Sequence, residues 1–308
     1  MILDGSLSIK QEALKLGFSD CGISEACFLN KESLFLDQWL NAGYEHDMAY
    51  MSRNKEKRVD PRLLVDNAKS IISVTYNYHT RKNQLDPDAP VISEYAYGVD
   101  YHLAIKIKLY KLLVFIKQKI DPKAKGRVFV DSAPVMERAW AVASGLGWYG
   151  KNTNVITRKG SFFFLGEIIT DISLTYDAPI KERCGRCTRC IDACPGKAIV
   201  EPYKLDSGKC ISYLTIEHKG SFAENVDLNN RVFGCDICQD VCPWNRFSEE
   251  NDEPGFVPNA ELMNKSKSDW YSLDEPEFDR LFKNSPLNRT GFKNIRRNLD
   301  RIMRDRRL

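Results

Sequence analysis

The chain has 308 residues, which is long enough for one large domain or two domains of ordinary size. Its apolar fraction of 43% and charged fraction of 28% are typical of globular proteins, and no apolar run is as long as a membrane span. The net charge of +3 is too small to indicate a partner by itself. Because the N-terminus lacks the basic and then apolar pattern of a signal peptide, we expect a cytoplasmic protein without membrane attachment.

Helix and strand patterns alternate in the first part of the chain. Apolar spacing predicts helices at 8–16, 35–40 and 105–120, and β-branched or aromatic runs predict strands at 70–76, 127–131, 154–157 and 162–172. A further helix is expected from Ala133 or Pro134 to about Ser144, because proline is favoured in a first turn. This alternation indicates an α/β or α+β domain over residues 1–175.

Two cysteine runs stand out in the second half of the chain. The first has the spacing C-x2-C-x2-C-x3-C-P of bacterial ferredoxins, and the second has C-x2-C-x3-C-P with Cys210 alone before it. In two-cluster ferredoxins the fourth cysteine of a run binds the other cluster. We therefore assign two [4Fe-4S] clusters, one held by Cys184, Cys187, Cys190 and Cys242, and one held by Cys194, Cys210, Cys235 and Cys238.

Zinc sites and disulfides are the alternatives for these cysteines. Zinc favours paired C-x2-C knuckles and does not need Cys-Pro at the end of both runs. A disulfide framework requires an oxidising compartment, which nothing in the sequence indicates. The spacing favours iron–sulfur clusters, in a ferredoxin-like domain that we place at residues 176–250. Cys21 and Cys27 lack ligand spacing, and we expect them to have no metal role.

Residues 251–308 form a third segment, which we predict to be helical with breaks at Pro276 and Pro286. Its last part, Ser285 to Leu308, contains eight Arg or Lys residues and only two acidic ones. A basic segment on a nearly neutral chain is a candidate phosphate-binding surface. Charge alone, however, favours the alternative of an ordinary solvated helix face.

Five motifs together resemble one known family. They are Val130–Arg138 (VDSAPVMER), Gly145–Asn152 (GLGWYGKN), Gly160–Glu167 (GSFFFLGE), Cys235–Asn245 (CDICQDVCPWN) and Ser285–Gly291 (SPLNRTG). Over nearly its whole length the chain resembles epoxyqueuosine reductase, which catalyses the last step of queuosine synthesis in tRNA. The resemblance implies that the epoxide of epoxyqueuosine, at the wobble position of the anticodon stem-loop, is reduced with electrons from an external donor.

The resemblance also implies cobalamin. The domain plan is similar to that of reductive dehalogenases, in which a corrinoid-binding domain precedes two four-iron clusters. None of the four histidines lies in the Asp-x-His-x-x-Gly pattern of histidine-ligated cobalamin, in agreement with the family. We expect the protein to be a monomer with one cobalamin and two [4Fe-4S] clusters.

Opening an epoxide requires a general acid, because the oxygen leaves poorly unless it is protonated. Asp131 is our candidate, since it ends a predicted strand within a family motif; the alternative is that it only caps the following helix. The resemblance places cobalamin contacts at Asp131 itself and at Arg58, Ser93, Asn154, Ser212, Asp236 and Ile237. For Arg58 the alternative is an ordinary surface charge.

For the tRNA we predict phosphate contacts from basic side chains in the Cys210 loop and the tail: Lys219, Arg289, Lys293, Arg296 and Arg297. Trp148, Tyr149 and Trp244 are candidates to stack on a splayed-out base, and each fits equally well in a core. Two other functions stay open on the residues alone. One is a dehalogenase-like reductase of a small molecule, and the other is a ferredoxin-type electron carrier.

Overall fold

The computed structural model describes residues 5–305, so the predictions for residues 1–4 and for the last three residues of the basic tail lie outside the described part. Its main sheet has the order β1-β2-β7-β4, formed by Asp20–Glu25, Ser70–Asn77, Phe163–Thr170 and Gly126–Phe129. All three strand pairs are antiparallel. The first domain is therefore α+β, without the parallel sheet of an α/β domain.

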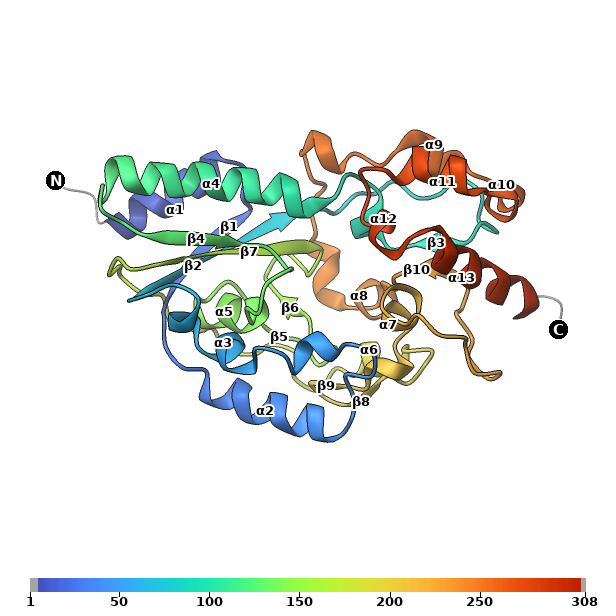
Figure 1. Ribbon diagram of the computed structural model, residues 1–308, viewed down its shortest axis with the longest axis horizontal. Helices are drawn as coiled ribbons and strands as arrows, with labels where there is room; N and C mark the ends of the chain where they lie inside the picture. The colour runs from blue at the N-terminus through green and yellow to red at the C-terminus, as the bar shows by residue number, and fades with distance from the viewer. Residues whose placement is uncertain (1–4, 306–308) are drawn as a thin grey trace.

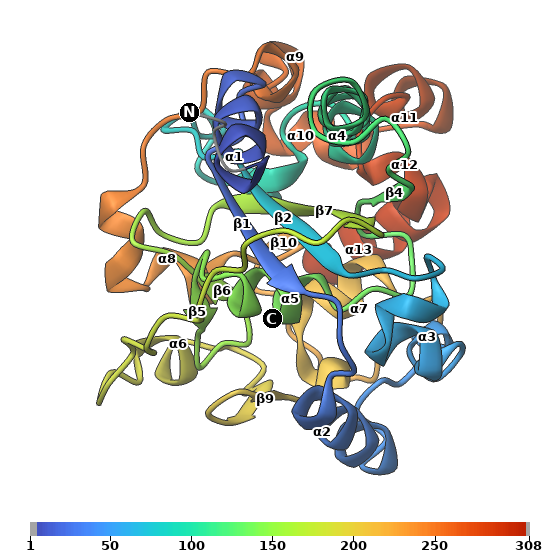
Figure 2. The same ribbon diagram turned by 90° about the vertical axis from the view of Figure 1, so that its left-hand side faces the viewer.

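Helices cover both faces of this sheet (Figures 1 and 2). On one face lie α1 (Gly5–Lys15) and α4 (Tyr101–Lys119), and on the other lie α2 (Asn30–Asn41), α3 (Lys55–Val59) and α5 (Glu137–Ala143). Successive side chains of β7 point to opposite faces of the sheet and pack in two hydrophobic cores. Ile168 packs in the core under α4, and Ile169 packs in the core under α5. The sheet thus holds the start of α4 and the start of α5 in fixed positions.

A second core lies beside the sheet, at the right of Figure 1. It contains a parallel pair of β3 (Val91–Ile92) with β10 (Arg231–Phe233) and the helix α7 (Ile211–Ile216). The C-terminal helices pack on it: α9 (Ala260–Asn264), α10 (Lys267–Ser272), α11 (Glu275–Phe282), α12 (Leu287–Thr290) and α13 (Phe292–Asp305). This core therefore contains residues from all three predicted segments, 1–175, 176–250 and 251–308.

The cysteine-rich region contains only short helices and strands. Loops that bind metal need little regular structure, because the bound metal contributes to folding. The short elements are α6 (Arg189–Asp192), β8 (Ile199–Glu201), β9 (Lys204–Leu205) and α8 (Ile237–Asp240). The hairpin of β5 (Trp148–Tyr149) and β6 (Val155–Ile156) lies next to them. Within residues 5–305, no helix combines the length and the apolar character needed to cross a membrane.

The structure differs from the sequence prediction at several elements, and two of these differences bear on the site. Strand β1 was not predicted, because Gly22 interrupts its apolar run; a Cβ atom there would lie 2.3 Å from the carbonyl oxygen of Ser144, so the position needs a glycine. The helix after Asp131 begins only at Glu137, and its N-cap is Met136. Asp131 therefore does not cap that helix, and the capping alternative is wrong.

Candidate active site and cysteine loops

Asp131 lies in the loop between β4 and α5, with its side chain 56% exposed. Its backbone has a φ of 55°, in the left-handed region that costs a non-glycine residue about 1 kcal/mol or more. The Tyr101 hydroxyl donates a hydrogen bond to Asp131 Oδ2 at 3.0 Å, and His102 Nε2 lies 3.0 Å from the same oxygen. The loop is thus held in a strained form by contacts from the start of α4.

His102 bridges two carboxylates. Its Nδ1 lies 2.5 Å from Asp100 Oδ1 and its Nε2 faces Asp131. Burial by itself would lower the pKa of His102, but the hydrogen bonds with Asp100 and Asp131 outweigh it and the pKa is raised. Burial opposes the ionised form of Asp100 too, yet the hydrogen bonds with His102 lower its pKa to about 2. The two carboxylates therefore stabilise the imidazolium form of His102.

The same contacts act on Asp131. Although the side chain is partly exposed, the groups packed around its carboxyl desolvate it and raise its pKa. The hydrogen bonds from His102 and Tyr101 and the positive charges of His102 and Arg289 outweigh that effect, so the pKa is lowered. Arg289 comes from α12, and its Nη1 lies 3.0 Å from His102 Nε2 while its Nε donates to Asp100 at 3.3 Å. The predicted tRNA contact Arg289 is therefore also part of the surroundings of the acid.

Two glutamates lie behind the Asp131 loop. Glu137, in the first turn of α5, accepts a hydrogen bond from the backbone N–H of Asp131. Glu167, on β7, is completely buried. Burial is the main cause that raises the pKa of Glu137, to about 8, and it raises that of Glu167 well above its ordinary value. Sequence reasoning missed both roles, although both residues belong to the family motifs.

Several residues predicted to contact cobalamin have buried or half-buried side chains. Ser93 is completely buried, and Asp236 is 8% exposed with its carboxylate accepting from the Glu94 backbone N–H at 2.7 Å. Burial raises the pKa of Asp236 to about 6. Asn154, Ser212 and Ile237 are half-buried.

Arg58 provides a test of whether a bound cofactor fits. Its Nη2 donates to the carbonyl of Tyr50 at 3.1 Å, but its buried Nε has no partner among residues 5–305. Burial, the main cause, lowers the pKa of this guanidinium, and the charge of Glu137, beside Asp131, opposes the shift. An acceptor such as an amide or phosphate oxygen of a corrinoid would satisfy the Nε, so the residues present fit such a group.

Several cysteines of each predicted group lie near one another, but within residues 5–305 no three His, Cys, Asp or Glu side chains are arranged to hold a metal ion, so the ligand sets stay a prediction. The outer group (Cys184, Cys187, Cys190, Cys242) lines one cavity of about 60 Å³, so the loop of the second run does reach the first. In the inner group (Cys194, Cys210, Cys235, Cys238) the thiol of Cys210 lies near Cys194, and that of Cys238 lies near Cys210 and Cys235. Both Asp236 and Gln239 are buried next to inner cysteines, whereas the outer loop exposes three arginines: Arg183, Arg186 and Arg189.

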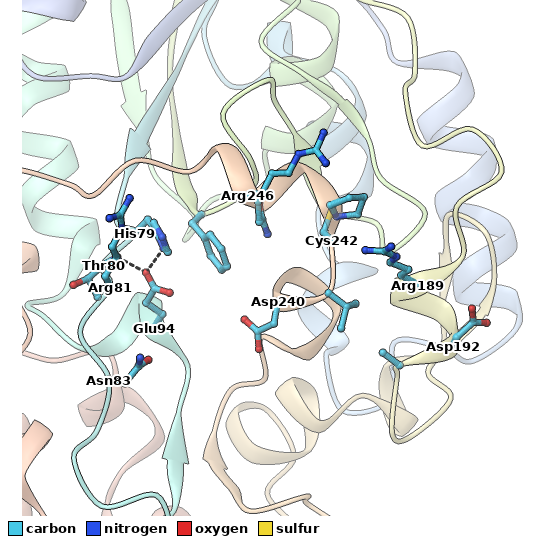
Figure 3. A pocket seen from close by; sticks show the side chains of 15 residues that line it. His79, Thr80, Arg81, Asn83, Glu94, Arg189, Asp192, Asp240, Cys242 and Arg246 are labelled. Carbon is cyan, nitrogen blue, oxygen red and sulfur yellow. Dashed lines mark hydrogen bonds and ion pairs between the residues drawn. The ribbon is translucent and has the colours of Figure 1, made fainter.

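A larger hollow of about 1130 Å³ lies beside the outer group and does not include Asp131. Figure 3 shows Cys242 between Arg246 and Arg189 on one side of this hollow, and Arg81 with His79 and Glu94 on the other. Sequence reasoning did not foresee this hollow, because its lining comes from segments far apart in the chain.

The predicted phosphate contacts have different surroundings. Lys219 and Lys293 are exposed, while Arg296 pairs with Asp300 and donates to the carbonyl of Tyr271. Arg297 donates to the carbonyls of Leu214, His218 and Gly220, and its remaining N–H groups bond to Asn298. Arg297 therefore has no donor left for phosphate, and we correct its role to fixing the loop that carries Lys219.

The three aromatic residues predicted as candidates to stack on a base also differ in their surroundings. Trp148 is buried and packs edge-on against Trp244 at 4.9 Å between ring centroids, so it belongs to the core. Tyr149 is half-buried, and Trp244 lines the cavity of the outer group. None of the three therefore presents an exposed ring for a base.

The comparisons with known proteins agree with this arrangement. Residues 183–245 match the family model of a 4Fe-4S double cluster binding domain, which decides against zinc and disulfides for these cysteines. Residues 58–132 match the model described as Epoxyqueuosine reductase QueG, DUF1730. The epoxyqueuosine reductase of Cellulophaga algicola is 50% identical over 95% of this chain and 96% of its own. The chain belongs to the epoxyqueuosine reductase family. The family consists of oxidoreductases, so the protein is an enzyme of that class.

Solved structures place the fold in the same family. One crystal structure of an epoxyqueuosine reductase superposes with a TM-score of 0.88 at 30% identity, over 96% of this chain and 80% of that one. Another, with a TM-score of 0.85 at 30% identity and the same coverage, contains an epoxyqueuosine-modified tRNA-Tyr stem loop. A Bacillus subtilis structure, also at a TM-score of 0.85, 29% identity and that coverage, has its catalytic aspartate loop swung out of the active site. A reductive dehalogenase at 16% identity and a TM-score of 0.50 shares only the fold.

Proposed function

We propose that the protein reduces epoxyqueuosine at the wobble position of tRNA to queuosine, with cobalamin and two [4Fe-4S] clusters. The observation that carries the proposal is that one protein combines the Asp131–His102 pair with eight cysteines in the two predicted groups of four. The pair can supply a proton, and the cysteines can bind the clusters that supply electrons. The substrate is supported by the relatives, one of which was solved with the modified stem loop. We further propose a cytoplasmic monomer that takes electrons from an external donor.

The reaction consumes two electrons and two protons, since the epoxide becomes an alkene and the oxygen leaves as water. Bound cobalamin would supply a strongly reducing cobalt centre that collects electrons arriving singly from the clusters. Arg58, Asn154, Ser212, Asp236 and Ile237 are the residues we propose along this cofactor, with backbone groups acting where side chains are buried, as at Ser93.

The proton is held by Asp131 and His102 together. The lowered pKa of Asp131 and the raised pKa of His102 favour the proton on the imidazole, whose Nε2 lies 3.0 Å from Asp131 Oδ2. Arg289 Nη1, which can only donate, turns away from Nε2 when that nitrogen carries the proton. As negative charge develops on the epoxide oxygen next to Asp131, the proton passes to Oδ2 and then to that oxygen. Water can reach the exposed Asp131 side chain and supply the second proton. The loop of Asp131 is the one that we equate with the mobile catalytic loop of the Bacillus subtilis relative.

Electrons would enter at the outer group. Its cavity is lined by Arg183, Arg189 and Lys151 as well as by the four cysteines, and Arg186 is exposed on the same loop. The inner group lies deeper, and Asp236 between its cysteines bonds to the backbone next to Ser93. We propose that an acidic electron-carrier protein docks on the arginines, because opposite charges accelerate encounter.

The function is tested by incubating anaerobically reconstituted protein with cobalamin, a strong chemical reductant and tRNA that carries epoxyqueuosine, followed by mass analysis of the nucleosides. Queuosine should appear only when all components are present. Corrin bands in the visible spectrum with no product from the tRNA would favour the small-molecule reductase. An iron–sulfur spectrum without corrin binding would favour the electron carrier.

The donor surface is tested with Arg186→Glu/Arg189→Glu. Reduction of the clusters by a photoreduced acidic flavodoxin should slow by about tenfold or more at low salt, whereas reduction by dithionite should not change. Lys117→Glu on α4, on the opposite side of the main sheet from α5, changes charge in the same direction and serves as the control. Equal slowing by the control, or slowing with dithionite as well, would contradict docking at these arginines.

A further inference from the structure

The buried carboxyl of Glu167 has no ordinary partner. Glu167 lies opposite Ser73 on β2 and Phe129 on β4, on the face of the sheet that α5 covers. It is completely buried, and within residues 5–305 no hydrogen-bond donor reaches either of its carboxylate oxygens. A buried carboxylate without donors is strongly disfavoured, so this group is neutral unless another group compensates it.

The neighbour of Glu167 is a second carboxyl, not a cation. Glu137 lies within hydrogen-bonding reach of it, and two carboxyls can bond to each other only if one carries a proton. Glu137 Oε1 already accepts the backbone N–H of Asp131, which leaves its other oxygen to accept an O–H. Protonated Glu167 is then the donor and Glu137 the acceptor, so Glu137 links Glu167 on β7 to the backbone N–H of the Asp131 loop.

We propose that Glu137 and Glu167 share one proton and act as a latch that holds the Asp131 loop in the active site. Neither carboxyl touches the substrate, so both are positioning residues. The latch offsets the strain of the left-handed backbone at Asp131. When the shared proton is lost, two adjacent carboxylates repel each other beside a third at Asp131, and the loop is released.

The charged groups around the pair determine the direction of the pH dependence. His102 and Tyr101 face it from α4, Asp131 from its own loop and Arg58 from α3. Desolvation is the main cause that raises the pKa of Glu167, the proton donor, well above its ordinary value, and the negative charges of Glu137 and Asp131 act in the same direction. The shared proton is therefore retained at neutral pH, and the latch opens as pH rises through the pKa of Glu167.

This inference rests on the proposed role of Asp131, but its test does not need turnover. Hydrogen–deuterium exchange measures protection of the Asp131 amide in cobalamin-free protein, corrected for the intrinsic exchange rate. In the parent, protection should fall at alkaline pH once the pKa of Glu167 is passed, by roughly tenfold per pH unit. Glu167→Gln keeps a donor for Glu137 but cannot lose a proton, so its amide should stay protected at alkaline pH. Glu167→Leu has no donor and should lose protection at neutral pH.

Glu25→Gln, at the exposed end of β1 in the same sheet, is the matched control and should behave like the parent. Infrared difference spectroscopy should show the carbonyl band of a protonated carboxylic acid in the parent, lost in Glu167→Gln. If Glu167→Leu does not fold, Glu167→Gln still decides. The same alkaline loss of protection in Glu167→Gln as in the parent, or no protonated band that depends on Glu167, would overturn the latch. Failure of turnover with an intact latch would refute only the proposed function.

Discussion

Replacement of Asp131 by Asn removes the ability to transfer a proton while keeping the size of the side chain and the backbone conformation. Asn tolerates a left-handed φ better than most residues, so the backbone at 55° can be kept. The Asn side-chain oxygen can still accept the hydrogen bond that Tyr101 donates. It cannot, however, take a proton from His102 and pass it on. General acid catalysis contributes about 100- to 10,000-fold, so we expect a loss of that size, or roughly 3–5 kcal/mol in activation free energy.

The effect on stability should be small. The Asp131 side chain is 56% exposed, so its ion pair with His102 is screened by water and contributes about 0–1 kcal/mol. For a chain of this size, that corresponds to roughly 2–4 °C or less in Tm. No helix cap is lost, because α5 begins at Glu137 with Met136 as its N-cap.

The assay is a single turnover of cobalamin-loaded, chemically reduced protein on the modified stem-loop, read by mass analysis, with Tm and cobalamin content measured on the same preparation. A rate near that of the parent would remove Asp131 from the mechanism. Loss of cobalamin together with the rate would show that Asp131 binds the cofactor and would refute a purely acid role. We expect full cofactor content and almost no product.

Cys242→Ala should destroy the cluster bound by the first cysteine run and spare the one bound by the second, as read by Mössbauer spectroscopy; the reverse pattern would refute the crossed ligation. Arg297→Ala removes hydrogen bonds to three backbone carbonyls and should lower the free energy of unfolding by about 2–4 kcal/mol. Lys293→Ala should leave unfolding unchanged but weaken stem-loop binding with a smaller salt slope, and equal Tm losses in the two variants would contradict this division. The Asp100 pKa is lowered from 3.8 to about 2, so its stabilisation is present above pH 3.8 and is lost as pH falls toward 2. Acid unfolding of Asp100→Asn should lack this decline. The pH above which its turnover fails should also be lower than in the parent, because His102 loses a carboxylate that raises its pKa.

The sequence was sufficient to predict those features that depend only on residues close together along the chain. Iron–sulfur ligation depends on cysteine spacing, so the 4Fe-4S binding domain could be predicted without a structure, while the crossed ligation stays a prediction. The helix at α4 and the strands β2 and β7 followed from strong apolar periodicity. Strand β1 and the start of α5 could not, since Gly22 is required by a contact with Ser144 and the Asp131 loop is held by residues distant in sequence.

Only the tertiary structure decided what surrounds the acid. Arg289 lies 187 positions after His102 yet touches it, and Glu167 reaches the Asp131 loop only because β7 pairs with β4. Charge counting made Arg297 a phosphate ligand, but the fold turns it inward to three carbonyls. A pKa, a strained φ and the partner of an arginine all depend on neighbours brought together by packing, and the order of residues along the chain does not specify those neighbours.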